Sequence, residues 1–153
     1  MKNKYINEQI RMFLKDSDMI AALANISSLI MNSYSDLNWA GFYLVRSDNL
    51  TVGPFQGKPA CTPIAFDKGV CGRCYREAAV QRVDDVLKVQ DHIACDAASR
   101  SELCVPVIVN EKVVMEIDLD APIPSRFDDD FEKEMLQTAS DIADAYLQHN
   151  WKI

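Results

Sequence analysis

Two stretches of β-strand chemistry, each turning back on a short polar segment, constrain the fold of this chain more than any other feature. In the first, apolar and aromatic residues run over 37–45 and resume at 50–52 after a polar turn. In the second, the segments 102–109 and 112–119 flank Asn110-Glu111. Strand-forming runs separated by so few turn residues are typical of β-hairpins. The sequence therefore predicts two antiparallel hairpins.

Amphipathic helices are predicted near both ends of the chain. Apolar residues recur at helical spacing over 19–30, directly after Ser17 and Asp18, which are residue types that cap helices. An earlier apolar set over 5–13 predicts a preceding helix, and the acidic run 128–130 suits the N-terminus of a last helix because of the macrodipole. This order of elements predicts an α+β fold in which terminal helices cover an antiparallel sheet.

The segments between the hairpins are predicted to be mostly loops. Residues 53–63 carry two Gly and three Pro, and residues 84–100 are polar, with one helical turn expected. Short strands at 64–66 and 81–83 and a helix through 75–79, entered by a turn between Gly69 and Gly72, are expected among them. The length of 153 residues fits one domain, so we expect residues 1–153 to form it. Long loops in a compact domain are usually functional, and we expect the site there.

The charge and the apolar pattern exclude several classes of function. The chain has 16 Lys and Arg against 23 Asp and Glu, a net charge of −7, and such a surface repels phosphate backbones. Apolar runs stay well short of the roughly 20 residues that span a bilayer, and the N-terminus does not have the pattern of a signal peptide. We therefore expect a cytoplasmic protein that binds neither nucleic acid nor membrane, and its amphipathic terminal helices favour a homodimer.

Five cysteines form the most informative chemical pattern. All of them lie between Cys61 and Cys104, and an odd number in a chain without an export signal argues against a structural disulfide framework. Cys104 lies in the apolar run 103–107, so burial in the core and a chemical role both stay open for it.

Cys71 and Cys74 form a C-x-x-C pair. A thioredoxin-type motif needs a βαβ context that this order of elements lacks. Half of a zinc site needs two more ligands, which Cys61, Cys95 or His92 could supply only through the tertiary fold. Cys71 also lies at the predicted N-terminus of a helix, where free N–H groups and the macrodipole lower the pKa of a thiol.

Cys95 lies in a polar segment that is too poor in large apolar residues to belong to the core. A cysteine in such a loop is accessible to oxidants and substrates, so Cys95 is a candidate nucleophile. His92 and Arg100 favour its thiolate. Asp91 and Asp96 disfavour the thiolate, so the sequence does not decide whether Cys95 is a thiolate or a thiol. Because His92 is close in the sequence, a Cys–His pair of the protease or transferase kind is an alternative.

Glu116, Asp118 and Asp120 alternate along the last predicted strand, so their side chains share one face of it. Like charges in a row on a strand repel one another unless a cation neutralises them. A metal ion or the ammonium group of a ligand would do so, whereas a solvated face would need neither. A binding site and a feature of the surface are both consistent with this row.

Together these segments resemble the free methionine-(R)-sulfoxide reductases, which are built on a GAF domain. The resemblance covers nearly the whole chain and rests on runs in the same order: Asn38-Trp39-Ala40-Gly41-Phe42-Tyr43, Gly53 to Cys61, Gly69-Val70-Cys71-Gly72, His92-Ile93-Ala94-Cys95-Asp96, Ser99-Arg100-Ser101-Glu102, Asp118-Leu119-Asp120 and Arg126-Phe127-Asp128. Met115 departs from the pattern, since the family usually has Gly there. The resemblance implies a single GAF-like domain with a central antiparallel sheet, N- and C-terminal helices packed on it, and long loops over the site.

The resemblance also implies the residues of the site. The redox cysteines of the family fall on Cys61, Cys71 and Cys95, its substrate acids on Glu102, Asp118 and Asp120, and its aromatic pocket residues on Trp39 and Tyr43. Cys74 and Cys104 lie outside its pattern. The implied activity is the reduction of free methionine-(R)-sulfoxide, a product of oxidative stress, to methionine. A thiolate attacks the sulfur, and an acid with a raised pKa protonates the oxygen.

For the activity that the resemblance implies, we assign the attack on the sulfoxide sulfur to Cys95 and the protonation of its oxygen to Glu102. Cys61 is the first candidate to resolve the sulfenic acid as a disulfide and Cys71 the second, and thioredoxin is the expected reductant. No metal or organic cofactor is expected. The alternative is a non-catalytic GAF sensor that binds a small ligand, because a fold does not define a function. Three thiols in pocket loops argue against the sensor.

Overall fold

The computed structural model describes residues 4–92 and 95–153. Its elements in chain order are α1 (Ile6–Phe13), α2 (Met19–Ser33), β1 (Trp39–Val45), β2 (Asn49–Gly57), β3 (Ile64–Ala65), α3 (Gly69–Glu77), β4 (Gln81–Val83), the 3₁₀-helix η1 (Val86–Lys88), β5 (Ser101–Val109), β6 (Lys112–Ala121) and α4 (Asp129–Gln148). The α+β class, both hairpins and the helices near both ends are therefore confirmed.

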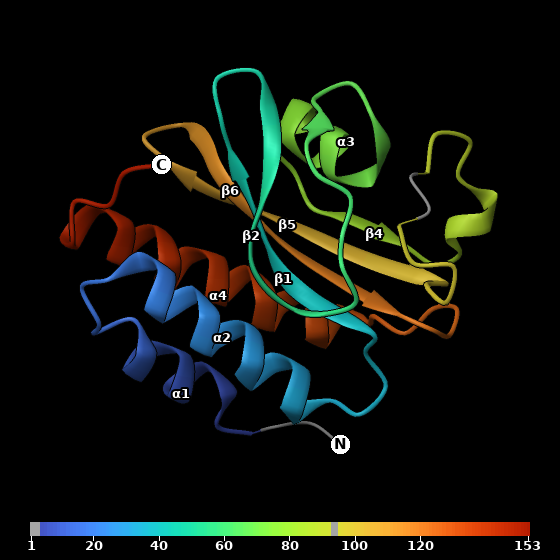
Figure 1. The fold of residues 1–153 in the computed structure, drawn as a ribbon. Helices are drawn as coiled ribbons and strands as arrows, with labels where there is room; N and C mark the ends of the chain where they lie inside the picture. The colour runs from blue at the N-terminus through green and yellow to red at the C-terminus, as the bar shows by residue number, and fades with distance from the viewer. Residues whose placement is uncertain (1–3, 93–94) are drawn as a thin grey trace.

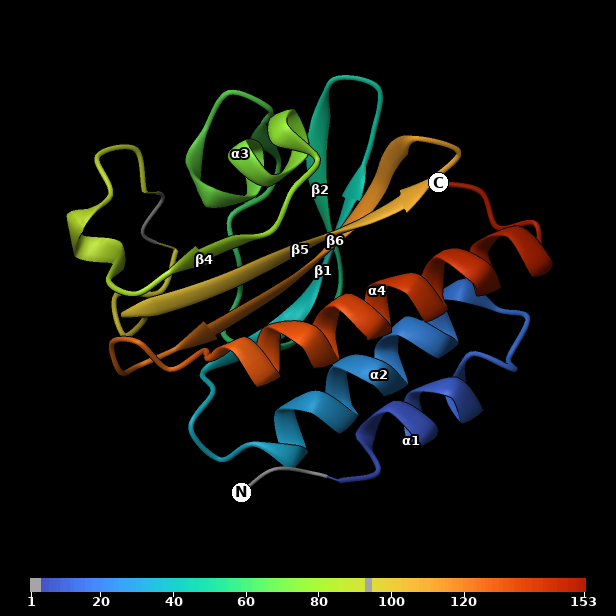
Figure 2. The same cartoon turned by 180° about the vertical axis from the view of Figure 1, so that it is seen from behind.

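The strands form one six-stranded antiparallel sheet in the order β3-β2-β1-β6-β5-β4. The two predicted hairpins, β1–β2 and β5–β6, meet where β1 pairs with β6. Figure 1 shows α1, α2 and α4 on one face of the sheet and α3 with the long loops on the other, and the view from behind in Figure 2 shows the same two layers. The sheet thus separates a helical core from a face covered by loops.

The helical core is built from the apolar face of the central strands. Phe42 of β1, Leu103 of β5 and Ile117 of β6 are fully buried there against Ile26 of α2 and Met135 of α4. Full burial of a side chain of this size stabilises the fold by about 1.5–3 kcal/mol. This layer holds the sheet rigid beneath the loops of the other face.

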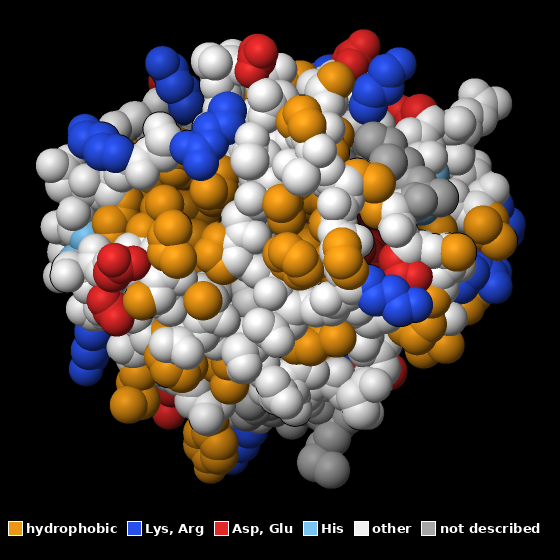
Figure 3. All heavy atoms as spheres, in the orientation of Figure 1, with side chains coloured by type: hydrophobic (Ala, Val, Ile, Leu, Met, Phe, Trp, Pro, Cys, Tyr) orange, Lys and Arg blue, Asp and Glu red, His pale blue; other side chains and the backbone are white. Residues whose placement is uncertain are grey.

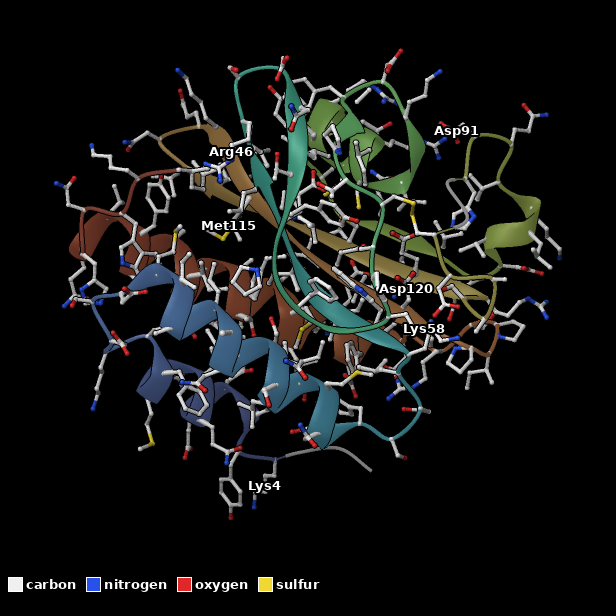
Figure 4. All side chains as sticks on the ribbon, in the orientation of Figure 1. Lys4, Arg46, Lys58, Asp91, Met115 and Asp120 are labelled. Carbon is white, nitrogen blue, oxygen red and sulfur yellow. A yellow bond between two sulfur atoms is a disulfide. The ribbon has the colours of Figure 1, made fainter. Side chains whose placement is uncertain are left out.

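Strand β6 sends alternate side chains to opposite faces of the sheet, because successive residues of a strand point in opposite directions. Met115, Ile117 and Leu119 enter the helical core, whereas Glu116 and Asp118 are buried on the other side. Figure 4 shows Met115 on the side of the helices. The residue that departs from the family pattern therefore lies on the face away from the acids.

The caps of the two long helices have the residues that the sequence indicated. The Asp18 carboxylate accepts a hydrogen bond from the Ala21 backbone N–H at 3.0 Å, and Asp128 accepts one from the Phe131 N–H at 2.8 Å. Each bond satisfies an N–H group that has no partner within its helix. Of the two cap candidates before α2, Asp18 is therefore the cap.

Strand β2 is longer than predicted. The loop expected over 53–63 begins only after Gly57, because this part of the chain pairs with β1, for example Phe55 with Gly41. Strand β3 pairs with β2 only at Asn49 and Leu50, so Pro54 has no strand on its outer side. A proline at such an edge removes no hydrogen bond from the ladder. The prediction was wrong for 53–57 because edge position is a tertiary property.

Helix α3 begins earlier than predicted, at Gly69, and contains Gly72. A Cβ added at Gly72 would lie 2.8 Å from the Phe66 carbonyl oxygen, so the helix can approach this loop closely only with glycine there. The helix ends at Glu77, and Ala78 takes a left-handed conformation with φ 48°. The two glycines therefore belong to the helix rather than to a turn before it.

The surface mixes several kinds of side chain. Figure 3 shows apolar side chains across the middle of the face that carries the β1–β2 hairpin, with Lys and Arg side chains mostly around its rim. Among the residues that the structure describes, every helix is too short or too polar to cross a membrane.

Candidate active site

A pocket with about 550 Å³ of empty volume, open to solvent, lies on the face of the sheet opposite the helical core. Its lining comes from β1, β3, β5, β6, the start of α3 and the loops before and after that helix: Trp39, Tyr43, Pro59, Ala60, Ile64, Lys68, Gly69, Val70, Cys71, His92, Cys95, Asp96, Ser99, Glu102, Asp118 and Asp120. A cleft lined by apolar side chains and a few convergent polar groups is typical of a small-molecule site. All the predicted site residues except Cys61 line this pocket.

Cys61 is linked to the pocket by its disulfide with Cys95, which is one of the lining residues. The two Cα atoms lie 5.5 Å apart, within the usual range of about 4.4–6.8 Å. The Tyr43 hydroxyl donates a hydrogen bond of 2.8 Å to the Cys61 carbonyl oxygen, which ties this loop to β1. The bond fits a redox-active disulfide.

Asn38, just before β1, holds the loop that carries Cys95. Its side-chain amide donates to the Asp96 carboxylate at 3.1 Å and to the Ser99 hydroxyl at 3.0 Å. The sequence analysis placed Asn38 in a family run but assigned it no role, because nothing local shows which distant loop it meets. The predicted positions Ile93 and Ala94 of the same loop lie outside the described residues.

The charged residues around Cys95 are paired with other partners. The guanidinium of Arg100 lies 3.3 Å from the Asp85 carboxylate, and Arg73 lies 3.5 Å from Asp91. The charges of Arg100 and Asp91 are therefore largely neutralised by these partners. The effects expected of Arg100 and Asp91 on the Cys95 thiolate are reduced accordingly. His92 Nε2 lies 3.8 Å from Glu102 Oε2, and burial lowers the pKa of His92, so the imidazole is mostly neutral at pH 7.

The acids of the pocket come from two neighbouring strands. Glu102 of β5 lies opposite Asp120 of β6, and Asp118 follows on the same face. Burial, with the charges of Asp118 and Asp120, raises the pKa of Glu102 well above its ordinary value, and burial also raises the pKa of Asp118 and of Asp120. Carboxyls that hold protons at neutral pH can act as acids, and Asp118 Oδ1 has no hydrogen-bond partner among the described residues.

Lys58 lies in the loop between β2 and β3. The backbone carbonyl of Lys58 accepts a hydrogen bond of 3.1 Å from the Trp39 indole. Trp39 stacks on Phe55 and Tyr43, with ring centroids 5.1 Å and 5.9 Å away. An apolar wall and a carboxyl row thus face the same pocket. The sequence analysis did not identify apolar lining residues such as Ile64, because a single apolar residue in a sequence does not indicate a binding site.

The Cys71 thiol lies 3.9 Å from Glu102 Oε1 on the floor of the pocket. A hydrogen bond from Cys104 lowers the pKa of Cys71, but burial and the charges of Asp118, Glu116 and Glu102 outweigh it, and the resulting pKa is well above the ordinary value. The expected lowering at the helix N-terminus is therefore wrong. The dipole of one short helix does not compensate for loss of water and several nearby carboxylates.

The comparisons with known proteins agree with this geometry. Residues 18–146 match the family model of the GAF domain. The chain is 39% identical over 137 residues to the free methionine-R-sulfoxide reductase of Escherichia coli, covering 90% of this chain and 83% of that protein. It is 44% identical over 126 residues to the enzyme of that name from Saccharomyces cerevisiae, covering 77% and 69%.

Among solved structures, the X-ray structure of free methionine-R-sulfoxide reductase from Neisseria meningitidis in complex with its substrate matches with a TM-score of 0.91 at 32% identity, covering 95% of this chain and 88% of that one. Fold and site together define a GAF domain whose pocket is lined by cysteines and carboxyls. The chain belongs to the free methionine-R-sulfoxide reductase family of GAF domains.

Proposed function

We propose that this protein reduces free methionine-(R)-sulfoxide to methionine in the pocket between β1, β5 and β6. The observation that carries the proposal is the Cys61–Cys95 disulfide beside a pocket that holds the buried Glu102 carboxyl. Thiol chemistry on a sulfoxide needs a nucleophilic sulfur that can later be resolved, and a group that can give a proton to oxygen. Both lie in one pocket here.

The first step is attack by Cys95. Its thiolate forms a bond to the sulfoxide sulfur, and Glu102, which keeps its proton because its pKa is raised, protonates the oxygen. The oxygen then moves to the Cys95 sulfur while the S–O bond of the substrate and the newly formed S–S bond both break, which releases methionine and leaves Cys95 as a sulfenic acid. The substrate sulfur is reduced by two electrons and the cysteine is oxidised by two.

The second step is resolution by Cys61. Its thiol attacks the Cys95 sulfur, water leaves, and the disulfide forms. Cys71 is the second candidate, but it is buried and its pKa is raised, so little of it is thiolate at neutral pH. An external dithiol, which we propose is thioredoxin, then reduces the disulfide by thiol exchange.

Recognition of the free amino acid follows from the charges. Asp118 and Asp120 face the pocket, and a carboxylate there would pair with the α-ammonium group of the substrate. A methionine sulfoxide within a peptide has an uncharged amide at that position. Trp39 and Tyr43 offer the wall against which the methyl group packs. These contacts support a preference for the free amino acid.

The setting of the reaction is part of the proposal. Residues 1–153 act as one domain in the cytoplasm, without an organic cofactor in the reduction itself. A homodimer is proposed through the terminal helices, where Met12 of α1 and Ile20 of α2 are 67% and 63% exposed. Light scattering on the purified protein measures the oligomeric state.

Single-turnover chemistry tests the function. Reduced protein freed from reductant is mixed with one equivalent of free methionine-(R)-sulfoxide, and released methionine is measured by chromatography. The parent should release about one equivalent per protein and turn over steadily when thioredoxin, its reductase and NADPH are added. Cys95→Ser should release none, and Cys61→Ser should give a single burst with a sulfenic acid that a dimedone probe captures. Cys74→Ser, a cysteine outside the pocket lining, is the matched control and should behave as the parent.

Two outcomes would contradict the proposal. A methionine burst that survives in Cys95→Ser would remove Cys95 as the nucleophile. Binding of the sulfoxide by the parent without any methionine would favour a GAF domain that only senses a ligand. Peptide mapping that finds Cys71 linked to Cys95 would replace Cys61 as the resolving residue and leave the nucleophile unchanged.

A further inference from the structure

Three thiols and a carboxyl converge between α3 and the sheet, beneath the pocket. Cys71 and Cys74 come from α3, and a spacing of three residues places both on one side of the helix. Cys104 comes from β5 and Glu116 from β6. All four are buried, with Cys74, Cys104 and Glu116 at 0% exposure and Cys71 at 5%. Cys104 is therefore buried, which is one of the two alternatives that the sequence left open for it. Its neighbours are nevertheless not all apolar.

The distances among the ligand atoms of Cys71, Cys104 and Glu116 are those of a metal centre, and Cys74 lies outside this set. The Cys104 sulfur lies 3.9 Å from the Cys71 sulfur and 3.3 Å from Glu116 Oε1, and the ligand atoms of these three residues all lie within 4.8 Å of one another. Cys74 interacts with Cys104 and Glu116. A tetrahedral zinc ion with bonds of about 2.3 Å to sulfur and about 2.1 Å to oxygen needs separations of about 3.8 Å and about 3.6 Å. The observed separations differ by only a few tenths of an ångström.

Glu116 supplies a second, independent observation. Its Oε2 atom is buried and has no hydrogen-bond partner among the residues that the structure describes. The Cys104 thiol is the donor to its other oxygen. Orphaned buried polar atoms are rare in native proteins, and an ion that the structure does not contain is one of the standard explanations. The orphaned oxygen belongs to the same carboxyl that faces the thiols.

We propose that Cys71, Cys104 and Glu116 bind one thiophilic divalent metal ion of the Zn²⁺ type. Two sulfurs and one carboxylate oxygen favour zinc over magnesium or calcium, which prefer ligand sets made of oxygen alone. The thiols release their protons when the ion binds, and its charge offsets that of the thiolates and of Glu116. The expectation of no metal rested on the lack of two further ligands near the C-x-x-C, and the fold supplies them from β5 and β6.

A neighbouring set competes for the same ion. Cys71, Glu102 and Asp118 also lie within 4.8 Å of one another, but this set has one sulfur and two carboxyls. It belongs to the substrate pocket. The set with Cys104 has the softer donors and the orphaned oxygen, so we place the ion there. The inference does not depend on the proposed reductase activity, because neither Cys61 nor Cys95 is a ligand.

Metal titration of the reduced full-length protein tests the site. Metal-free protein is titrated with Zn²⁺ against a chromophoric chelator, and separately with Co²⁺, whose absorption reports tetrahedral thiolate ligation. The parent should bind one equivalent of Zn²⁺ and show thiolate-to-cobalt charge transfer. Cys104→Ala and Glu116→Gln should each weaken Zn²⁺ binding by more than about tenfold, since loss of even an outer-shell partner costs 10–100-fold. Cys61→Ala, which removes a thiol outside the cluster, should bind as the parent does.

Absence of stoichiometric binding by the parent would overturn the inference. So would normal binding by Cys104→Ala combined with a loss in Asp118→Asn, because the ion would then lie in the substrate pocket. Circular dichroism checks the fold of each variant. If Cys104→Ala does not fold, Glu116→Gln decides the question by the same titration. Methionine release by the metal-free parent is measured in parallel, so that failure of the metal site and failure of the reductase are distinguished.

Discussion

The Cys61–Cys95 disulfide predicts a large difference in stability between the oxidised and reduced protein. The bond joins residues separated by 34 positions. In the chain-entropy model, closing a loop of that size lowers the entropy of the unfolded chain enough to stabilise the fold by about 3.8 kcal/mol. An unfolding entropy of about 2.1 cal/mol/K per residue, applied to this chain, converts that free energy into a rise in Tm of about 12 °C.

The substrate itself can serve as the oxidant in this experiment. Protein reduced with dithiothreitol is freed from the reductant, treated with one equivalent of free methionine-(R)-sulfoxide, desalted and melted in a calorimeter. We expect the Tm to rise by about 12 °C, and a later addition of dithiothreitol should reverse the rise. Desalting removes bound ligand, whose binding would itself raise the Tm. Because the mechanism forms the disulfide only after catalysis, the Tm reports both the chemistry and the pairing.

Cys61→Ser is the control, since it can form the sulfenic acid but cannot close the bond. Its Tm should not change after the same treatment. The (S)-sulfoxide should leave the Tm of the parent unchanged. A rise of less than about 2 °C in the parent would refute the stability argument, and an equal rise in Cys61→Ser would refute the assignment of the disulfide.

Three further predictions test the acids and the loop. Glu102→Gln should lower turnover by roughly 10²–10⁴-fold, as expected for a lost general acid, in steady-state assays. Burial raises the pKa of Glu116 above its ordinary value near 4.5, so the contribution of Glu116 to the stability of the metal-free parent is fully present below that value and is lost as the pH rises through the folded-state pKa. Glu116→Gln should therefore be more stable than the parent at pH 8 and lose that advantage near pH 4, measured by urea unfolding. Asn38→Ala should lower kcat with little change in fold, because the loop of Cys95 loses both of its hydrogen bonds to the Asn38 side chain.

A specific result would contradict each of these three predictions. Unchanged kcat and KM in Glu102→Gln would remove it from the site. A stability gap for Glu116→Gln that is the same at pH 4 and pH 8 would show that ionisation is not the cause. Full activity of Asn38→Ala would show that the loop is held in place without that side chain.

Local patterns in the sequence were enough for most of the scaffold. Alternation within 112–119 and helical spacing over 19–30 depend on a residue and its near neighbours, so most strands and helices, and a cap at Ser17 or Asp18, follow from them. The strand that continues through Gly57 did not follow, because the place of β2 near the edge of the sheet depends on how β3 pairs with it.

The site was predictable only in part. The candidate residues came from local composition and from the family resemblance, which correctly indicated one pocket for Cys95 and Glu102. Their environment came from contacts between segments far apart in the chain. Arg100 meets Asp85, and carboxyls from two strands reverse the expected lowering of the Cys71 pKa.

The sequence by itself determined which side chains share a face of each strand or helix, because that follows from the geometry of one element. The register between β5 and β6, and the docking of α3 on both, decided which of those faces meet. Only that tertiary arrangement brings Cys104 and Glu116 to the C-x-x-C pair. Charge interactions and metal ligation depend steeply on distances of a few ångströms between such segments, so they are properties of the folded chain.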